Sequence, residues 1–480
     1  MTAAIPADPE PSHRARALGS QLAELADRQL YRRRRLCESP QAPLMEVEGR
    51  TLLTFCSNDY LGLAADARVI ETFTRAAGEF GVGSGASHLI NGHSRYHHQL
   101  EEALADFTQR PRALLFSTGY MANLGVISAL AGRGEQILCD RLNHASLIDG
   151  ARLSGARPRR YRHADPADLQ RLLASARSDK ATAMIISDGV FSMDGDLAPV
   201  PELARAAKQA DAWLLIDDAH GLGVIGADGR GTLAEIEAQA TSARDANDTN
   251  RKLVVGFGSG DGHGGLGGRT PPGSLEGGIH GVPRGRHPAQ NEPKSQRGSV
   301  YTLGEQQVPI LVGTLGKAFG TFGAFVAGSD ALIETLIQRA RSYIYTTALP
   351  PAVAAASLTS LELMQAEPWR RDHLGQLVRY FRQGAAELGL PLMPSITPIQ
   401  PLLAGSSARA LDWSRRLEAR GLLVPAIRPP TVPQGHARLR ISFSASHRIE
   451  DIDRLLEALA ALPTTDHPST DHPKQGAPAT

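Results

Sequence analysis

The sequence contains little cysteine and no long apolar run. Cys37, Cys56 and Cys139 are the three cysteines of the 480 residues, and no two form a CxxC pair. Such spacing supports neither a disulfide framework nor a cysteine-ligated zinc site, and it favours a reducing compartment. No segment approaches the ~18 apolar residues of a membrane-spanning helix, and the first residues lack the apolar part of a secretory signal. We expect a cytoplasmic protein with no membrane partner and no metal site.

The chain also lacks an excess of charge of either sign. Its 51 basic and 50 acidic residues give a formal net charge of +1. This balance provides no overall field to attract nucleic acid or an anionic membrane, so neither is expected as a partner. Basic residues do gather at 32–35, at the end of a helix that the leucine spacing predicts over about 18–35. That run is either a solvated helix face or a functional patch.

Short apolar runs alternate with helical stretches from residue 113 onward. Buried strands separated by helices are typical of an α/β fold with a largely parallel sheet. A second, smaller α/β unit is predicted after residue 345. The strands predicted for the first unit are 113–116, 136–139, 183–187, 213–216, 308–312 and 324–327, with helices at 121–131, 166–177 and 200–211. The second unit has predicted helices near 351–365, 372–387, 408–420 and 450–461 and strands near 398–403, 422–427 and 437–443.

Three segments lack the apolar periodicity of a packed core. Residues 237–305 are rich in glycine and proline and predict a flexible surface insertion. Residues 1–16 and 463–480 are polar and are predicted to be disordered; two histidines in the tail could bind a metal, although a solvated tail is favoured. The predicted organisation is therefore an N-terminal helix and arm at 17–60, a large domain at 61–344 that contains the insertion, and a small C-terminal domain at 345–462.

Polar residues follow four of the predicted strands. Asp217 and His220 follow one strand, Lys317 follows another, and Gly119 and His144 follow two more. Ligands of open α/β sheets bind at the carboxyl ends of the strands, which makes these residues candidates for a binding site.

Each of these residues has a structural alternative when it is considered alone. The aspartate could cap a turn, the lysine could extend into solvent and the histidine could be structural. Together, however, they match the needs of pyridoxal 5'-phosphate (PLP): a helix N-terminus for the phosphate, a flat side chain for the ring, a carboxylate for the pyridinium nitrogen and an amine for the aldehyde.

Four motifs resemble those of the α-oxoamine synthases, which are PLP-dependent enzymes of fold type I. They are SNDYLGL at 57–63, GVFSMDGD at 189–196, DDAHG at 217–221 and TLGK at 314–317. The resemblance covers about 18–236 and 306–461. It implies a large, mostly parallel sheet domain, a smaller C-terminal α/β domain and a homodimer. The chain departs from the family pattern at Ala86 and His88 and in the insertion between His220 and Lys317.

The resemblance also implies roles for individual residues. Lys317, Asp217 and His144 are the catalytic set: the lysine binds PLP covalently and moves the Cα proton, the aspartate pairs with the pyridinium nitrogen, and the histidine stacks on the ring. The implied cofactor-binding residues are Gly119, Tyr120, His144, Ser192, Asp217, His220, Thr314 and Lys317. The implied substrate-binding residues are Arg32, Asn58, His144, Arg428 and Thr431; Asn58 and Arg428 hold the amino-acid carboxylate, and Arg32 and Thr431 contact the acyl-CoA.

Within the family, AIRPPTVP at 426–433 and Arg32 are most similar to the members that condense L-alanine with pimeloyl-CoA or a pimeloyl-carrier protein, in biotin biosynthesis. Three alternatives stay open. A sister enzyme would condense glycine with acetyl-CoA. A transaminase would release pyruvate and would not depend on acyl-CoA. A non-catalytic relative would be expected to lack the lysine, and Lys317 is present.

Overall fold

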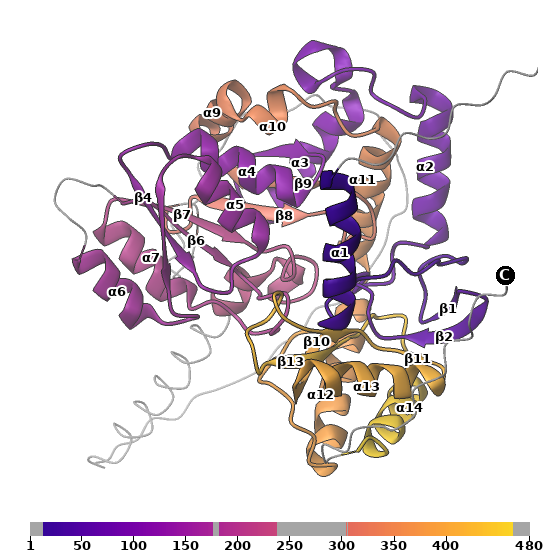
Figure 1. Ribbon diagram of the computed structural model, residues 1–480. Helices are drawn as coiled ribbons and strands as arrows, with labels where there is room; N and C mark the ends of the chain where they lie inside the picture. Colours follow the sequence, from indigo (N-terminus) through magenta and orange to yellow (C-terminus); the bar gives the residue numbers. More distant parts are fainter. Residues whose placement is uncertain (1–12, 176–181, 238–303, 305, 464–480) are drawn as a thin grey trace, which may run out of the picture. The chain divides into compact units, whose positions relative to one another are not determined.

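The largest sheet has seven strands in the order β3-β9-β8-β7-β6-β4-β5. Strand β9 runs antiparallel to β3 and β8, and all other neighbours are parallel, so the prediction of a mostly parallel α/β sheet is confirmed (Figure 1). The strands are β3 (Arg112–Phe116), β4 (Gln136–Asp140), β5 (Arg157–Tyr161), β6 (Thr182–Asp188), β7 (Trp213–Asp217), β8 (Ile310–Thr314) and β9 (Ala324–Gly328). Only β5 was not predicted, because its RPRRY sequence is an exposed edge strand without an apolar run.

This computed structural model describes residues 13–175, 182–237, 304 and 306–463. The predictions of disorder at 1–16 and 463–480 and of a flexible insertion at 237–305 lie almost wholly outside the described residues. At 13–16 the prediction of disorder was wrong, because these residues form the first turn of helix α1 (His13–Asp27).

Apolar side chains cover both faces of the seven-stranded sheet. Met184 and Ile186 of β6 pack into one apolar cluster, whereas Ile185 between them packs into another. Because successive side chains of a strand point to opposite faces, a continuously apolar strand needs helices on both sides. One face carries α4 (Gly119–Leu130), α5 (Ala145–Leu153), α9 (Asp330–Arg339) and α10 (Arg341–Ile344). The other carries α3 (Arg95–Thr108), α6 (Pro166–Ala174), α7 (Val200–Gln209) and α11 (Pro351–Ala366), against which α2 (Ala67–Phe80) packs.

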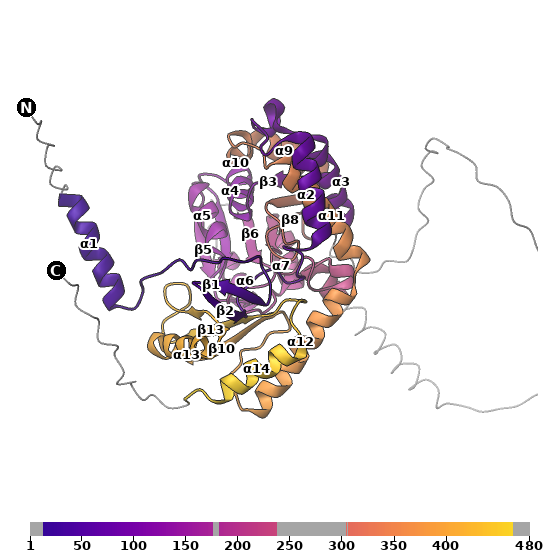
Figure 2. The ribbon, with the colours of Figure 1, turned by 90° about the vertical axis from the view of Figure 1, so that its right-hand side faces the viewer.

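The C-terminal residues form a second α/β layer. An antiparallel sheet of β10 (Ile399–Gly405), β13 (Ala437–Ser442) and β12 (Ala426–Ile427) packs with α12 (Trp369–Glu387), α13 (Ser407–Ala419) and α14 (Ile449–Ala460) (Figure 2). The prediction of one strand at 422–427 was wrong. Two short strands lie there, and β11 (Leu422–Leu423) joins β1 (Leu44–Val47) and β2 (Arg50–Thr54) in a third sheet. Pro425 lies between the two strands and has no N–H to donate to a ladder.

The first helix is shorter than predicted. Helix α1 spans His13–Asp27, and Gln29 adopts a left-handed backbone with φ 57°, which ends the helix. The run at 32–35 therefore lies beyond the helix, in chain without regular secondary structure, and does not form a helix face. Two short elements complete the fold, η1 (His88–Gly92) and η2 (Ala227–Gly229). Among the described helices, none is both long and apolar enough to cross a membrane.

A buried ion pair connects the two α/β layers. Arg438 on β13 is 1% exposed, and its Nη1 donates to Asp194 Oδ1 at 2.6 Å, in the loop after β6. Its Nε donates to the His436 carbonyl oxygen. A buried guanidinium that loses its carboxylate keeps the desolvation cost without the attraction.

We expect Asp194→Ala to lower the free energy of unfolding by about 3–5 kcal/mol, because it leaves the Arg438 charge buried and unpaired. Urea denaturation followed by circular dichroism measures the change. Arg205→Ala is the matched control, since it breaks an exposed pair with Glu202 that is worth less than about 1 kcal/mol. Equal effects of the two variants would contradict the assignment.

Candidate active site

The carboxyl ends of neighbouring parallel strands bring the predicted site residues to one edge of the sheet. Asp188, the last residue of β6, lies opposite Asp217, the last residue of β7. Asp217 in turn pairs with Val312 of β8, the strand that leads to Lys317. Strands β6, β7 and β8 therefore place two carboxylates and one amine side by side, as the strand-end argument predicted.

The Lys317 amine is the chemically reactive group of this edge. Its removal from water lowers the pKa of Lys317 to about 8, against the opposing attraction of the Asp217 and Asp188 carboxylates. The amine makes no hydrogen bond or ion pair with another described residue. An amine with a pKa near neutrality is unprotonated often enough to attack a carbonyl carbon.

Asp217 is a buried carboxylate held by two amide donors. Its Oδ2 accepts a hydrogen bond of 2.6 Å from Asn123 Nδ2, on α4, and its Oδ1 accepts one of 3.1 Å from the Ala219 backbone. The Asn123 amide also donates to Ser146 Oγ at 2.9 Å. These contacts fix the direction of the carboxylate, yet no cation pairs with it in the described part of the chain. A buried carboxylate in this state suits a cationic ring nitrogen.

Two further carboxyl groups lie close to Asp217. Burial and the neighbouring Asp217 charge raise the pKa of Asp188 well above its usual range. Burial raises the pKa of Asp218 to about 7, although Thr232 donates two hydrogen bonds to it. A raised pKa favours the protonated, uncharged form of each group, which limits the negative charge around the amine. Asp188 also accepts the backbone N–H of His144 at 2.7 Å, which positions that residue.

His144 caps α5 at the same edge. Its Nδ1 lies 2.7 Å from Ser146 Oγ, and burial lowers its pKa, so that the ring is neutral at pH 7. The Tyr120 ring meets it edge-on at 6.4 Å between centroids, and the Tyr120 hydroxyl bonds Asp149. A neutral imidazole oriented in this way can stack on a planar ligand.

The N-terminus of α4 offers donors for an anion. Thr118 caps the helix by accepting from Met121 N, whereas the N–H groups of Gly119 and Tyr120 have no acceptor among the described residues. A Cβ built on Gly119 would meet nothing within 4 Å, so the space in front of the helix is open. The Thr314 hydroxyl donates to the Gly323 carbonyl and must rotate before it can donate to a phosphate. The geometry suits a phosphate at α4.

A second network joins His220 to the C-terminal sheet. The Tyr60 hydroxyl lies 2.7 Å from His220 Nδ1 and 3.2 Å from Asn58 Oδ1. Arg440 of β13 donates from Nη2 to Asn58 Oδ1 at 3.1 Å and from Nε to the Ser192 carbonyl at 2.7 Å. Burial lowers the pKa of His220 well below its usual value, helped by the positive charges of Lys317 and Arg440. This network therefore places a neutral imidazole and a guanidinium beside the amine.

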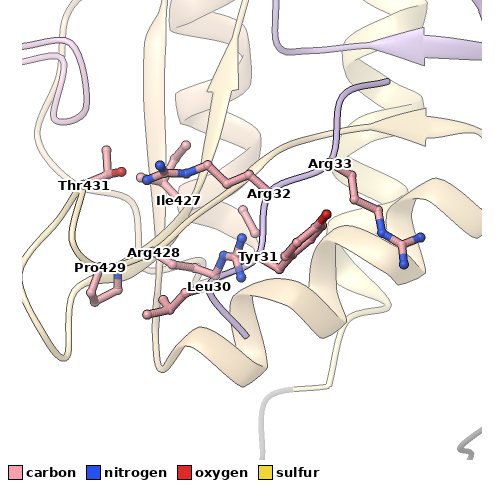
Figure 3. A pocket seen from close by; sticks show the side chains of 9 residues that line it. Leu30, Tyr31, Arg32, Arg33, Ile427, Arg428, Pro429 and Thr431 are labelled. Carbon is pink, nitrogen blue, oxygen red and sulfur yellow. The ribbon is translucent and has the colours of Figure 1, made fainter. Parts of the chain in front are cut away.

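Three of the predicted substrate residues meet in a separate pocket of about 310 Å³. Arg32, Arg428 and Thr431 line it together with Tyr31 and Pro429, among others (Figure 3). Arg32 extends toward Ile427 and Thr431, whereas Arg33 extends away from them. Burial and the positive charge of Arg32 lower the pKa of Arg428. Two guanidinium groups that repel each other in this way favour an anionic ligand.

Asn58 and Arg428 were predicted to hold the amino-acid carboxylate, and this stays a prediction. The arginine that contacts Asn58 in the structure is Arg440. No hydrogen bond links Asn58 to Arg428 in the described residues.

Sequence reasoning missed five residues of the site: Tyr60, Asn123, Ser146, Asp188 and Arg440. Asp188 directly follows the strand predicted at 183–187, so the strand-end rule could have found it. Tyr60 lies inside the motif at 57–63. Asn123 lies in a helix of apolar residues and Arg440 within a strand, and neither position carries a local signal.

The donor set as a whole fits PLP, because a buried carboxylate without a cationic partner among the described residues, an amine of lowered pKa and open helix N–H groups occur together.

A family model described as aminotransferase class I and II matches residues 50–251 and 286–459. The chain is 54% identical to 8-amino-7-oxononanoate synthase from Methylococcus capsulatus over 92% of its length and 97% of the relative. It is 52% identical to the enzyme of the same name from Pseudomonas putida, and that alignment covers 92% of this chain and 96% of the relative.

Solved structures show the same fold. A serine palmitoyltransferase from S. paucimobilis, crystallised with a PLP–myriocin aldimine, superposes with a TM-score of 0.75 at 27% identity and covers 94% of this chain and 98% of its own. The 8-amino-7-oxononanoate synthase from Francisella tularensis gives a TM-score of 0.63 at 27% identity, over 85% of this chain and 97% of its own.

We expect the labelling rate of Lys317 in the cofactor-free protein to be half-maximal near pH 8, because burial disfavours the charged amine. The measurement follows an amine-selective reagent by peptide mass spectrometry across pH. The peptide that carries the exposed Lys208 serves as the internal reference. A Lys317 midpoint at about pH 10.4, the value for a lysine in model peptides, would contradict the environment described above.

Proposed function

The chain belongs to the class I and II aminotransferase family and, within it, to the 8-amino-7-oxononanoate synthases; on that basis we propose how its residues carry out the reaction. The enzyme depends on PLP and condenses L-alanine with a pimeloyl thioester of CoA or of a carrier protein. The products are 8-amino-7-oxononanoate, CO₂ and CoA, in biotin biosynthesis. The observation that carries the assignment of roles is the Lys317 amine of lowered pKa beside the buried Asp217 carboxylate.

The chemical difficulty is the electron pair left on Cα of alanine when its proton is removed. Bound PLP supplies an electron sink for that pair. Asp217 keeps a proton on the pyridine nitrogen, because its buried negative charge favours the protonated ring. Asn123 and the Ala219 backbone hold the carboxylate in place for this task.

Lys317 holds the cofactor and then exchanges the Cα proton. Its pKa of about 8 allows the free amine to accept a proton and return it at neutral pH. With the cofactor bound, His144 would stack on its ring, and the N–H groups of Gly119 and Tyr120 would hold its phosphate. His220 and Ser192, which the Tyr60–Arg440 network links to β13, would contact the cofactor ring.

The alanine carboxylate binds Arg440 and Asn58 in this proposal. Arg440 is 5% exposed and already directs Nη2 at Asn58 Oδ1, so a carboxylate would find a guanidinium and an amide at one place. Arg428 then remains with Arg32 and Thr431 for the acyl donor. A pimeloyl thioester carries its own carboxylate and, in CoA, phosphates. Either anion suits the guanidinium groups of Arg32 and Arg428, which form no ion pair with any residue that the structure describes.

We expect the protein with PLP and L-alanine to release CoA from pimeloyl-CoA and to form the amino ketone in equal amount. Lys317→Ala should lose the covalently bound PLP and reduce turnover by at least about 10³-fold. Lys208→Ala, on an exposed face of α7, is the control. Release from acetyl-CoA with glycine at an equal rate would favour the sister condensation, and pyruvate formation without CoA release would favour transamination.

Arg32→Ala should raise KM for pimeloyl-CoA by about 10- to 100-fold, because it removes a charge-assisted contact worth about 1.5–3 kcal/mol. The effect on kcat should be smaller, and KM for alanine should not change. Arg415→Ala, an exposed arginine of α13, is the control. A change in KM for alanine with no change for pimeloyl-CoA would contradict the assignment of this pocket.

We also propose that the enzyme is a homodimer and works in the cytoplasm. The family resemblance supports the first statement, and the three free cysteines support a reducing compartment. Light scattering should give twice the mass of one chain, and fractionation should recover the activity with the cytoplasm. A monomer of full activity would contradict the homodimer. Recovery of the activity with membranes or with the medium would contradict the cytoplasmic location.

A further inference from the structure

A histidine cluster lies away from the Lys317 edge and takes no part in the reaction described above. Four imidazoles, those of His88, His93, His97 and His98, gather where η1 leads into α3. The ring centroids of neighbouring pairs lie 5.0–6.0 Å apart.

Two of the four histidines have structural partners on both sides. His97 is buried, with Nδ1 at Ser94 and Nε2 2.7 Å from the Leu349 carbonyl oxygen. His88 stacks on Tyr343 at 5.0 Å between centroids, and its Nδ1 lies 2.9 Å from His93 Nδ1. His93 and His98 are the exposed members, and each keeps a ring nitrogen available.

Glu101 stands one turn along α3 and provides a carboxylate. Its Oε1 accepts the Leu115 N–H at 2.9 Å, which leaves Oε2 available. The side chain is half-buried and forms no ion pair with any residue that the structure describes. A carboxylate in that position is stabilised by a nearby cation.

We propose that His93, His98 and Glu101 bind a divalent transition metal ion of the zinc class. Their ligand atoms all lie within 4.8 Å of one another, and exposed imidazoles can close to the separations of about 3.3 Å that metal–ligand bonds of about 2.1 Å require. Two imidazoles and one carboxylate favour Zn²⁺ over Mg²⁺ or Ca²⁺, which prefer oxygen ligands. Water completes the coordination.

Each ligand also has a group that orients it. His93 Nδ1 lies 2.9 Å from His88 Nδ1, which leaves its Nε2 for the metal. His98 Nε2 lies 3.4 Å from Glu102 Oε1, which leaves Nδ1 for the metal. The Leu115 amide holds Glu101. Outer contacts of this kind are what fix the tautomer and direction of metal ligands. The metal would tie the loop after η1 to α3 and, through Glu101, to β3.

The test is a titration of the full-length, PLP-loaded protein with Zn²⁺ by calorimetry, after removal of any affinity tag. The background carries His467→Ala and His472→Ala, which removes the two histidines of the tail. We expect one Zn²⁺ per chain and a higher melting temperature with Zn²⁺. His98→Ala should weaken binding by at least about tenfold and remove the thermal shift. Alanine is a good helix former, so this variant keeps α3 intact.

Two further variants complete the design. Glu101→Gln keeps an oxygen for the Leu115 amide and removes the charge, and it should weaken binding like His98→Ala. His436→Ala changes an exposed histidine elsewhere and should bind Zn²⁺ as the parent does. Equal affinity in His98→Ala and the parent, an equal loss in His436→Ala, or no binding at all would overturn the proposal.

Discussion

The active site is governed by the desolvation free energy of a lysine amine and several carboxyl groups, which are held out of water at one edge of the large sheet. Parallel strands force this arrangement, because their carboxyl ends meet at the same edge and the register sets Asp188 beside Asp217. Burial then disfavours the charged form of each group: the pKa of Lys317 falls to about 8, and the pKa values of Asp188 and Asp218 rise. Asp217, held by two amide donors, is the carboxylate kept for a cationic ligand. An amine with nucleophilic character follows from this balance.

The C-terminal layer completes the site from the opposite side. Arg440 and Arg438 alternate with apolar residues on β13, and both point toward the loop after β6. Arg438 connects the two layers through its ion pair with Asp194. Arg440 donates hydrogen bonds to Asn58 Oδ1 and to the Tyr60 hydroxyl. Stability and substrate recognition thus use neighbouring positions of one strand, and the substrate side is assembled from residues about 380 positions apart in the chain.

Lys317, Asp217, His144 and Gly119 could be located from the sequence, because a polar residue or a glycine shortly after an apolar run is a local pattern. Asn123 and Arg440 could not be found in this way. Their importance comes from contacts between elements that are distant in sequence, and locally they look like an amide in an apolar helix and a charge in a strand. The end of α1 was misplaced because leucine periodicity continues to Leu30 while the backbone at Gln29 turns left-handed.

The central claim is that one bound ring contacts both Lys317 and Asp217. A crystal structure of the PLP-loaded protein tests it most directly. The account predicts continuous density from Lys317 Nζ to the cofactor, with the pyridine nitrogen within hydrogen-bonding distance of an Asp217 carboxylate oxygen. Density that joins the cofactor to another residue, or a ring nitrogen that faces away from Asp217, would contradict it.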